Sequence, residues 1–95
     1  EEGHRHEMPI LLRRAHLETV EIPGDARAAG MLLGETNLRA RTGANVIGVD
    51  RSGTSIVSPG ADLRLEAGDR VLLMGNEAQL AAARDLLRAP AGGEE

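Results

Sequence analysis

The side chains of this sequence that could bind or transform a ligand are mostly arginines and carboxylates. All 11 basic residues are Arg and none is Lys. A guanidinium group holds a phosphate or a carboxylate through two parallel hydrogen bonds, so anion binding is a chemistry open to this chain. A bias in the base composition of the genome explains the same preference, and both interpretations remain open.

The sequence offers no arrangement for nucleophilic catalysis. It has no Cys, and all its His residues lie at or before His16, where the first predicted strand begins. The candidate serine nucleophiles fall together in one predicted hairpin region, at Ser52, Ser55 and Ser58. A serine nucleophile requires a base beside it. We therefore expect that the chain is not an enzyme.

Metal binding has two weak candidates. Asp62, Glu66 and Asp69 form a loose acidic cluster, but they lack the spacing of a calcium-binding EF-hand loop, and solvation of a turn is the alternative. A structural zinc site requires further Cys or His ligands beside His4 and His6. None lies nearby in the sequence. We therefore expect no metal site.

The length limits the chain to one domain with a thin core. Its 95 residues and 10.0 kDa cannot build a second hydrophobic core. No Phe, Tyr or Trp is present, so aliphatic side chains, which bury less area than aromatic ones, must fill the core. Without cysteine to form a disulfide, so small a domain gains stability by burying surface against a second copy. We therefore expect a homodimer.

The charge balance bears on the class of partner. The net charge is −4 and the sequence pI is about 5.3, whereas nucleic-acid backbones bind basic faces and single strands bind stacking aromatic residues. This predicts that no nucleic acid is a partner. The sequence also has no apolar run of about 18 residues and no signal-peptide pattern. We therefore expect a soluble, cytoplasmic domain.

The pattern of apolar residues predicts the elements that must position the polar groups. Alternation over 16–22 indicates a strand, and Arg51-Ser52-Gly53 between two β-branched runs indicates a tight hairpin. Asn76 followed by Gln79 is typical of a capped helix. The predicted elements are a strand at 16–22, a short helix at 28–35, hairpin strands at 45–50 and 54–57, a strand at 70–74, and a helix from 76 to 88.

This order, β-α-β-β-β-α, predicts an α+β fold whose small sheet is mostly antiparallel, with the helices packed on one face. Residues 16–88 form the domain. Residues 1–15 are predicted to be a linker or a short helix, and residues 89–95 a flexible tail.

Three stretches together resemble one known family. They run from Gly30 to Arg39, from Thr42 to Gly53 and from Leu65 to Gly75, with Pro59 between the last two. The third reads Leu-Glu-Ala-Gly-Asp-Arg-Val-Leu-Leu-Met-Gly. In this order, and over residues 17–87, they closely resemble the TrkA-C domain, the C-terminal subdomain of RCK regulatory modules.

The resemblance implies a cytoplasmic regulatory domain of a potassium channel, a potassium uptake system or a cation:proton antiporter in the cell membrane, fused to it or bound in trans. Residues 38–51 are most similar to domains found behind antiporters. Members of the family usually form dimers, and several bind an adenine nucleotide, notably cyclic di-AMP, between the two subunits. The implied ligand of this chain is cyclic di-AMP or another adenine nucleotide, with no other cofactor.

Carried over residue by residue, the resemblance implies a ligand site of Arg39, Asn45, Val46, Ile47 and Pro59. Arg39 suits a phosphate, and Asn45 offers both a donor and an acceptor to a base or a ribose. Val46 and Ile47 suit the two faces of a ring.

Structural roles are the alternative for the polar residues of this site. Arg39 is spaced to pair with Glu35, four residues before it, and Asn45 to satisfy backbone groups at a strand entrance. A histidine with which some family members bind cyclic di-AMP is absent, and Thr54 or Ser55 occupies that area. This departure favours a second hypothesis, a dimerisation or docking module without a ligand.

Overall fold

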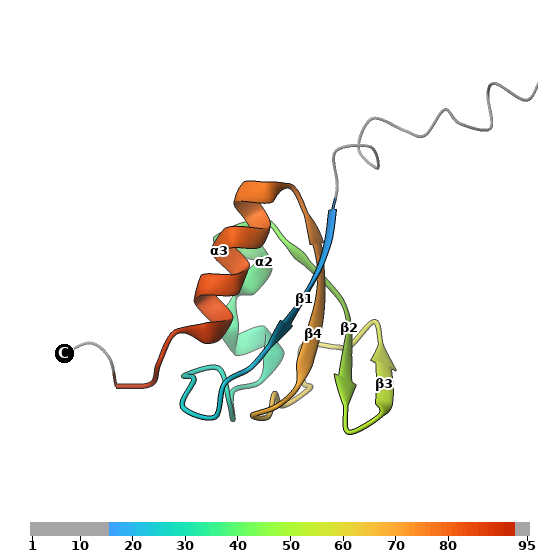
Figure 1. Ribbon diagram of the computed structural model, residues 1–95, viewed down its shortest axis with the longest axis vertical. Coiled ribbons are helices and arrows are strands. Elements are labelled where there is room, and N and C mark those ends of the chain that lie inside the picture. Colours follow the sequence, from blue (N-terminus) through green and yellow to red (C-terminus); the bar gives the residue numbers. More distant parts are fainter. Residues whose placement is uncertain (1–15, 93–95) are drawn as a thin grey trace, which may run out of the picture.

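The computed structural model describes residues 16–92, which form four strands, two α-helices and a short 3-10 helix that precedes the first α-helix (Figure 1). The elements are β1 (His16–Glu21), η2 (Leu33–Thr36), α2 (Leu38–Thr42), β2 (Asn45–Arg51), β3 (Thr54–Val57), β4 (Arg70–Gly75) and α3 (Glu77–Arg88). The predicted linker at 1–15, with His4 and His6, lies outside the described residues. The predicted α+β class is confirmed.

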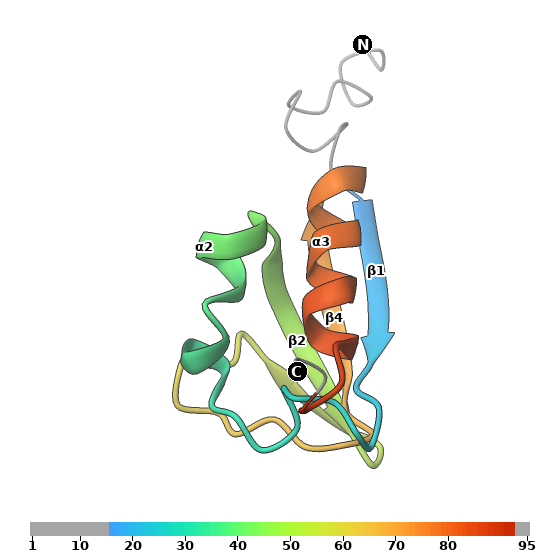
Figure 2. The same ribbon diagram turned by 90° about the vertical axis from the view of Figure 1, so that its left-hand side faces the viewer.

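The four strands form one antiparallel sheet in the order β1-β4-β2-β3. Both α2 and α3 cover the same face of this sheet (Figures 1 and 2). In the central strand β4, Val71 and Leu73 are buried against the helices, whereas Leu72 and Met74 lie on the other face and are half-buried. The predicted antiparallel sheet with helices on one face is therefore confirmed.

Local signals placed the hairpin and the last helix correctly. The β2–β3 turn has positive φ at Ser52 (50°) and Gly53 (83°), as a two-residue type I′ turn requires. At the start of α3, the Asn76 side chain accepts a hydrogen bond from the Gln79 N–H (2.8 Å), and the Gln79 side chain accepts one from the Asn76 N–H (2.9 Å). These reciprocal bonds satisfy two free donors of the first turn.

The short helix predicted at 28–35 is wrong. Turns precede Leu33, where η2 begins, and Gly30 has a φ of 95° that no helix accommodates. Backbone N–H groups of this segment bond to the loop before β4 instead, from Gly30 to the carbonyl of Leu65 (2.7 Å) and from Leu33 to that of Leu63 (2.7 Å). Pairing with a distant loop therefore replaces the helical hydrogen bonds.

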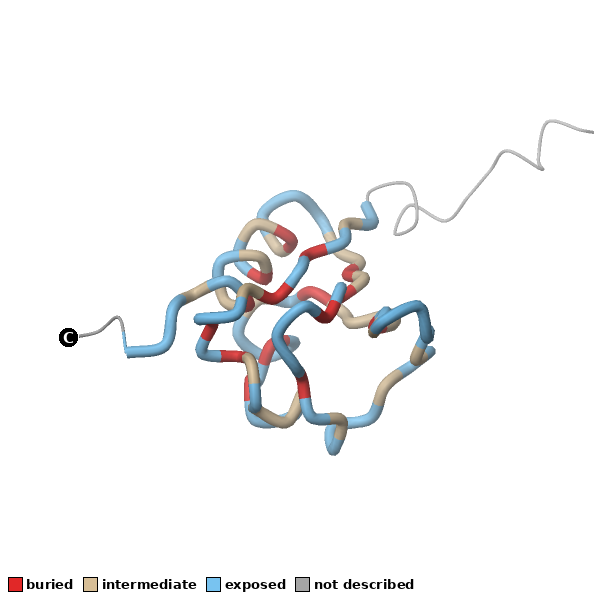
Figure 3. Tube along the Cα trace, turned by 60° about the horizontal axis from the view of Figure 1, so that its bottom comes forward, coloured by how far each residue is buried: buried red, intermediate tan, exposed pale blue. Residues whose placement is uncertain are grey.

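The core lies between the sheet and its two helices and is entirely aliphatic. Its largest fully buried apolar side chains are Ile22, Val49, Leu65, Val71, Leu73 and Leu87. In Figure 3, buried and exposed positions alternate along much of the chain. Val20 and Ile22 are buried, but Leu17 is 63% exposed, because strand alternation places it on the face without helices.

The chain after α3 is tied to the domain. Residues 89–92 belong to the predicted flexible tail, yet the Ala89 carbonyl accepts a hydrogen bond from the Arg27 N–H (2.8 Å), and the Ala91 N–H donates to the Asp25 carbonyl (2.8 Å). Pro90 forms a bridge with Ala26. The segment therefore closes one end of the core. No helix within residues 16–92 is long and apolar enough to cross a membrane.

Candidate functional site

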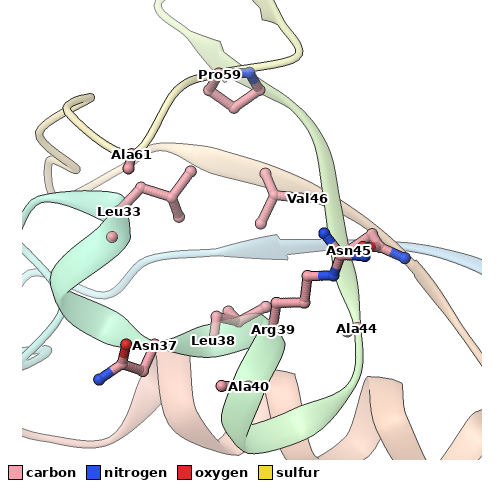
Figure 4. A pocket seen from close by; sticks show the side chains of 11 residues that line it. Leu33, Asn37, Leu38, Arg39, Ala40, Ala44, Asn45, Val46, Pro59 and Ala61 are labelled. Atoms are coloured by element: carbon pink, nitrogen blue, oxygen red, sulfur yellow. The ribbon is translucent and has the colours of Figure 1, made fainter.

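A cleft of about 700 Å³ opens beside α2 (Figure 4). Its walls come from η2 and α2, from the start of β2 and from the loop that follows β3. The lining residues are Leu33, Gly34, Asn37, Leu38, Arg39, Ala40, Ala44, Asn45, Val46, Pro59 and Ala61.

Two threonines fix the short helix that carries Arg39. The hydroxyl of Thr36 accepts a hydrogen bond from the N–H of Leu38 (3.2 Å), at the start of α2. At the other end, the Thr42 hydroxyl donates to the Leu38 carbonyl (2.7 Å) and accepts from the N–H of Ala44 (3.1 Å). So short a helix is unstable alone, so these bonds help to hold Arg39 at the cleft.

The turn from α2 into β2 requires glycine at position 43. Gly43 has a φ of 83°, and a Cβ there would lie 2.6 Å from the Nε2 atom of Gln79 on α3. Its N–H donates to the Arg39 carbonyl (2.8 Å) and closes the helix. The chain then enters β2 at Asn45, which lines the cleft together with Arg39.

The opposite wall is a loop held by backbone contacts. The Ser58 N–H donates to the Ile47 carbonyl (3.0 Å), and the Gly34 N–H donates to the Ala61 carbonyl (2.9 Å). A Cβ at Gly34 would lie only 2.9 Å from the Cβ of Ala61, so glycine allows the two segments to touch. Pro59 is thereby brought over the cleft.

The polar residues of the cleft have unused hydrogen-bonding groups. Within residues 16–92, the guanidinium of Arg39 forms neither an ion pair nor a hydrogen bond. Glu35, its possible partner, accepts a hydrogen bond from the Leu32 N–H instead (2.9 Å). The strand entrance is satisfied by Thr42, not by the side chain of Asn45. Both structural alternatives proposed for these two residues are therefore absent from the described part of the chain.

The remaining walls are apolar. Figure 4 shows Leu33 and Val46 pointing toward one another from opposite sides, with Pro59 above them. No acidic residue and no candidate nucleophile lines the cleft in the described residues. One cation and two amides, Asn37 and Asn45, beside apolar walls suit a ligand that joins an anionic group to a flat, weakly polar one.

The structure brings most of the predicted site together. Arg39, Asn45, Val46 and Pro59 line the cleft, but Ile47 does not. A bulge between Val46 and Gly48 displaces Ile47 from the regular pairing. The sequence reasoning missed seven lining residues, of which four are Gly or Ala: Leu33, Gly34, Asn37, Leu38, Ala40, Ala44 and Ala61.

The acidic cluster has a structural function that the sequence did not reveal. The side chain of Asp69 is 1% exposed and accepts hydrogen bonds from Arg51 Nε (2.9 Å), Arg51 Nη2 (2.8 Å) and the Glu66 N–H (2.9 Å). Burial acts to raise the pKa of Asp69, but these hydrogen bonds and the charge of Arg51 hold it below its usual value. Residues 16–92 contain no group of side chains suited to hold a metal ion.

Comparison with known proteins identifies the fold. The TrkA-C domain model matches residues 17–88. The RCK_C domain dimer of S. agalactiae BusR in complex with c-di-AMP is 28% identical, with a TM-score of 0.70 over 75% of this chain and 93% of that chain. The RCK C domain of the potassium transport protein KtrA, in complex with c-di-AMP, is 24% identical, with a TM-score of 0.71 over 80% and 87% of the two chains. A search of curated proteins gave no match.

The prediction that no nucleic acid is a partner is wrong as a general statement for proteins with this domain. S. agalactiae BusR in complex with its busA-promoter DNA is 27% identical, with a TM-score of 0.71 over 78% of this chain. This chain spans only 37% of that BusR chain. The acidic balance of 95 residues describes their own surface alone, so it does not decide what a longer protein binds.

Proposed function

The chain belongs to the TrkA-C domain family, and we propose that it is a non-catalytic regulatory domain that binds an adenine nucleotide in the cleft around Arg39. Cyclic di-AMP is the first candidate, since the BusR domain, 28% identical, is in complex with it. The observation that carries the proposal is the unpaired Arg39 guanidinium beside Asn45 and an apolar wall.

Each group in the cleft has a counterpart in such a ligand. A phosphate accepts a bidentate pair of hydrogen bonds from Arg39. The Asn45 amide pairs with the edge of a base, and Leu33, Val46 and Pro59 cover its flat face. Leaving these groups unpaired costs little in the free protein, because Arg39 is exposed and the cleft is open to water.

We propose that two copies of the chain share one ligand. Cyclic di-AMP contains two phosphates and two adenines, whereas one cleft supplies a single arginine. A second copy related by two-fold symmetry would supply the other Arg39, and the BusR domain in complex with c-di-AMP is itself a dimer. The homodimer expected from the thin aliphatic core then also forms the complete ligand site.

The regulated partner in this proposal is a potassium or other cation transport system in the cell membrane, such as a cation:proton antiporter, with the domain in the cytoplasm. It is either fused to the membrane protein or bound in trans. A ligand shared by two chains biases such a partner only if it binds one arrangement of the chains more tightly than the other. The coding sequence upstream of Glu1 tests the fused form, which requires several long apolar segments there.

Calorimetric titration with cyclic di-AMP, AMP, ATP and NADH tests the ligand. We expect saturable binding of cyclic di-AMP at one ligand per two chains. Arg39→Ala should weaken it by about 10- to 100-fold, because a hydrogen bond to a charged group contributes about 1.5–3 kcal/mol. Asn45→Ala should weaken it by about tenfold, as expected for a neutral hydrogen bond.

Arg41→Ala is the matched control, because Arg41 lies on the same helix and does not line the cleft. Equal losses for Arg39→Ala and Arg41→Ala would indicate a general charge effect and contradict the site. No binding of any of the four nucleotides at high micromolar concentration would contradict the ligand itself.

The second candidate function is a dimerisation or docking module without a ligand. The residues at the place of the family histidine favour it. Neither Thr54 nor Ser55 lines the cleft, and the Ser55 hydroxyl donates instead to Asp50 Oδ1 (2.7 Å). This candidate predicts that the chain dimerises while every nucleotide fails to bind, and that Arg39→Ala changes neither property.

A further inference from the structure

The sheet face opposite α2 and α3, here called the open face, carries no helix among residues 16–92 (Figure 1). The strand register arranges its side chains in rows that cross all four strands. One row is polar and consists of Glu21, Arg70, Asp50 and Ser55. The next row consists of Thr19, Leu72, Gly48 and Val57.

The polar row has charges of alternating sign that are not paired within the domain. Arg70 lies between Glu21 on β1 and Asp50 on β2. These residues and Ser55 line one hollow of about 450 Å³, which confirms that they share a face. Neither Arg70 nor Asp50 forms an ion pair within residues 16–92.

The neighbouring row is apolar and uneven. Val57 is 75% exposed, and Leu72 is only half-buried. Gly48 lies between them without a side chain, and the depression between Leu72 and Val57 is bounded by the backbone of β3, since a Cβ at Gly48 would lie 3.1 Å from the Ile56 carbonyl oxygen. Leu17, 63% exposed, and its cross-strand partner Met74 continue the apolar surface into a third row. Adjoining exposed apolar side chains of this kind mark interaction surfaces.

The strand order makes this pattern complementary to itself. A two-fold axis parallel to the strands, placed between β4 and β2, would set β4 of one copy over β2 of the other. Arg70 of each copy would then face Asp50 of the other, and Leu72 would enter the depression over Gly48. Two sheets packed face to face keep their strands within about 30° of each other, so these pairs near the axis stay in register.

We infer that the open face binds a second copy of this chain, through two reciprocal Arg70–Asp50 ion pairs and the insertion of Leu72 over Gly48. This contact is separate from the cleft and does not rest on nucleotide binding. A chain with two different self-complementary surfaces assembles beyond a dimer, so both contacts together produce a tetramer or a longer assembly.

Charge exchange tests the inference in the absence of nucleotide, by sedimentation equilibrium of residues 1–95 at low salt. Arg70→Asp alone and Asp50→Arg alone place like charges opposite one another and should weaken this association by about tenfold or more. An equimolar mixture of the two variants should regain the wild-type association, because each variant then faces its opposite charge. The double variant Arg70→Asp/Asp50→Arg should regain it without mixing.

The mixture separates contacts between chains from effects within one chain. Positions 50 and 70 are cross-strand neighbours, so each single variant also has like charges within its own sheet, and circular dichroism checks that it folds. Those intrachain charges are unchanged by mixing, so recovery can only come from contacts between chains. A mixture that associates no better than its components, or single variants that associate like the wild type, would overturn the inference.

Discussion

Arg39 precedes β2 in the sequence and Arg51 is its last residue, and the two side chains have opposite roles in the fold. Arg51 ends β2 with its side chain 27% exposed, and it donates to both carboxylate oxygens of Asp69 and to the Arg64 carbonyl. Arg39 is exposed at the cleft and donates to no residue of 16–92. The same guanidinium chemistry therefore stabilises the fold at one place and remains available for a ligand at the other.

The difference follows from what surrounds each arginine. The buried Asp69 helps to organise the turn before β4 by accepting hydrogen bonds from the Glu66 N–H and the Arg51 guanidinium. The segment around Arg39 is already fixed by Thr36, Thr42 and Gly43. Arg39 is therefore not required to hold its own surroundings together.

Removal of Arg51 should cause the largest loss of stability. Arg51→Ala leaves the Asp69 carboxylate buried without its cation, and breaking a buried pair in this way costs about 3 kcal/mol, at the low end of the usual range because Arg51 is partly exposed. Urea unfolding at pH 7 measures the change. A loss below about 1 kcal/mol, as for surface pairs, would show that the Arg51–Asp69 pair does not organise the loop.

The same pair should make stability depend on acid pH. The pKa of folded Asp69 lies below its ordinary value of 3.8, so the unfolded chain binds more protons there and stability rises with pH. The contribution is complete above about pH 5 and disappears as the pH falls through the folded pKa. Unfolding of the wild type and of Asp69→Asn between pH 3 and 7 measures it: the difference between them should shrink as the pH falls. A constant difference would contradict a charged Asp69.

Much of the fold was predictable because its signals are local. The turn at Ser52-Gly53 and the cap at Asn76 each depend on neighbours a few residues away, and both lie as predicted. The helix predicted at 28–35 failed because the competing hydrogen bonds come from residues about 30 positions later in the chain. Asp69 was mistaken for a solvated turn residue because its partner, Arg51, is 18 residues away in the sequence.

Gly43 offers a smaller perturbation on the Arg39 side of the comparison. Gly43→Ala forces an alanine to a φ of 83° and places its Cβ against Gln79, which should cost about 1–2 kcal/mol of stability. Because Gly43 closes α2, nucleotide affinity should also fall. Gly53→Ala is the control: its φ is also 83° but no atom lies within 4 Å of the added Cβ, so it should leave affinity unchanged. If Gly43→Ala and Gly53→Ala lowered nucleotide affinity equally, the turn at Gly43 would have no specific role in shaping the cleft.

The candidate site was predictable only in part. Arg39, Asn45, Val46 and Pro59 followed from the family resemblance, and the structure brings them to one cleft. Ile47 was misplaced because a β-bulge cannot be read from one sequence without its partner strand. The small residues Gly34 and Ala61 become significant only when the fold brings them into contact.

Arg39→Ala should have the smallest effect on stability, and it tests the comparison most directly. Arg39 has no ion pair and no side-chain hydrogen bond to lose within residues 16–92. The free energy of unfolding in urea should therefore change by less than about 0.5 kcal/mol, as for ordinary surface substitutions. Nucleotide affinity in the same variant should fall by about 10- to 100-fold. A loss of stability close to that of Arg51→Ala would mean that Arg39 also supports the fold and would remove the distinction between the two arginines.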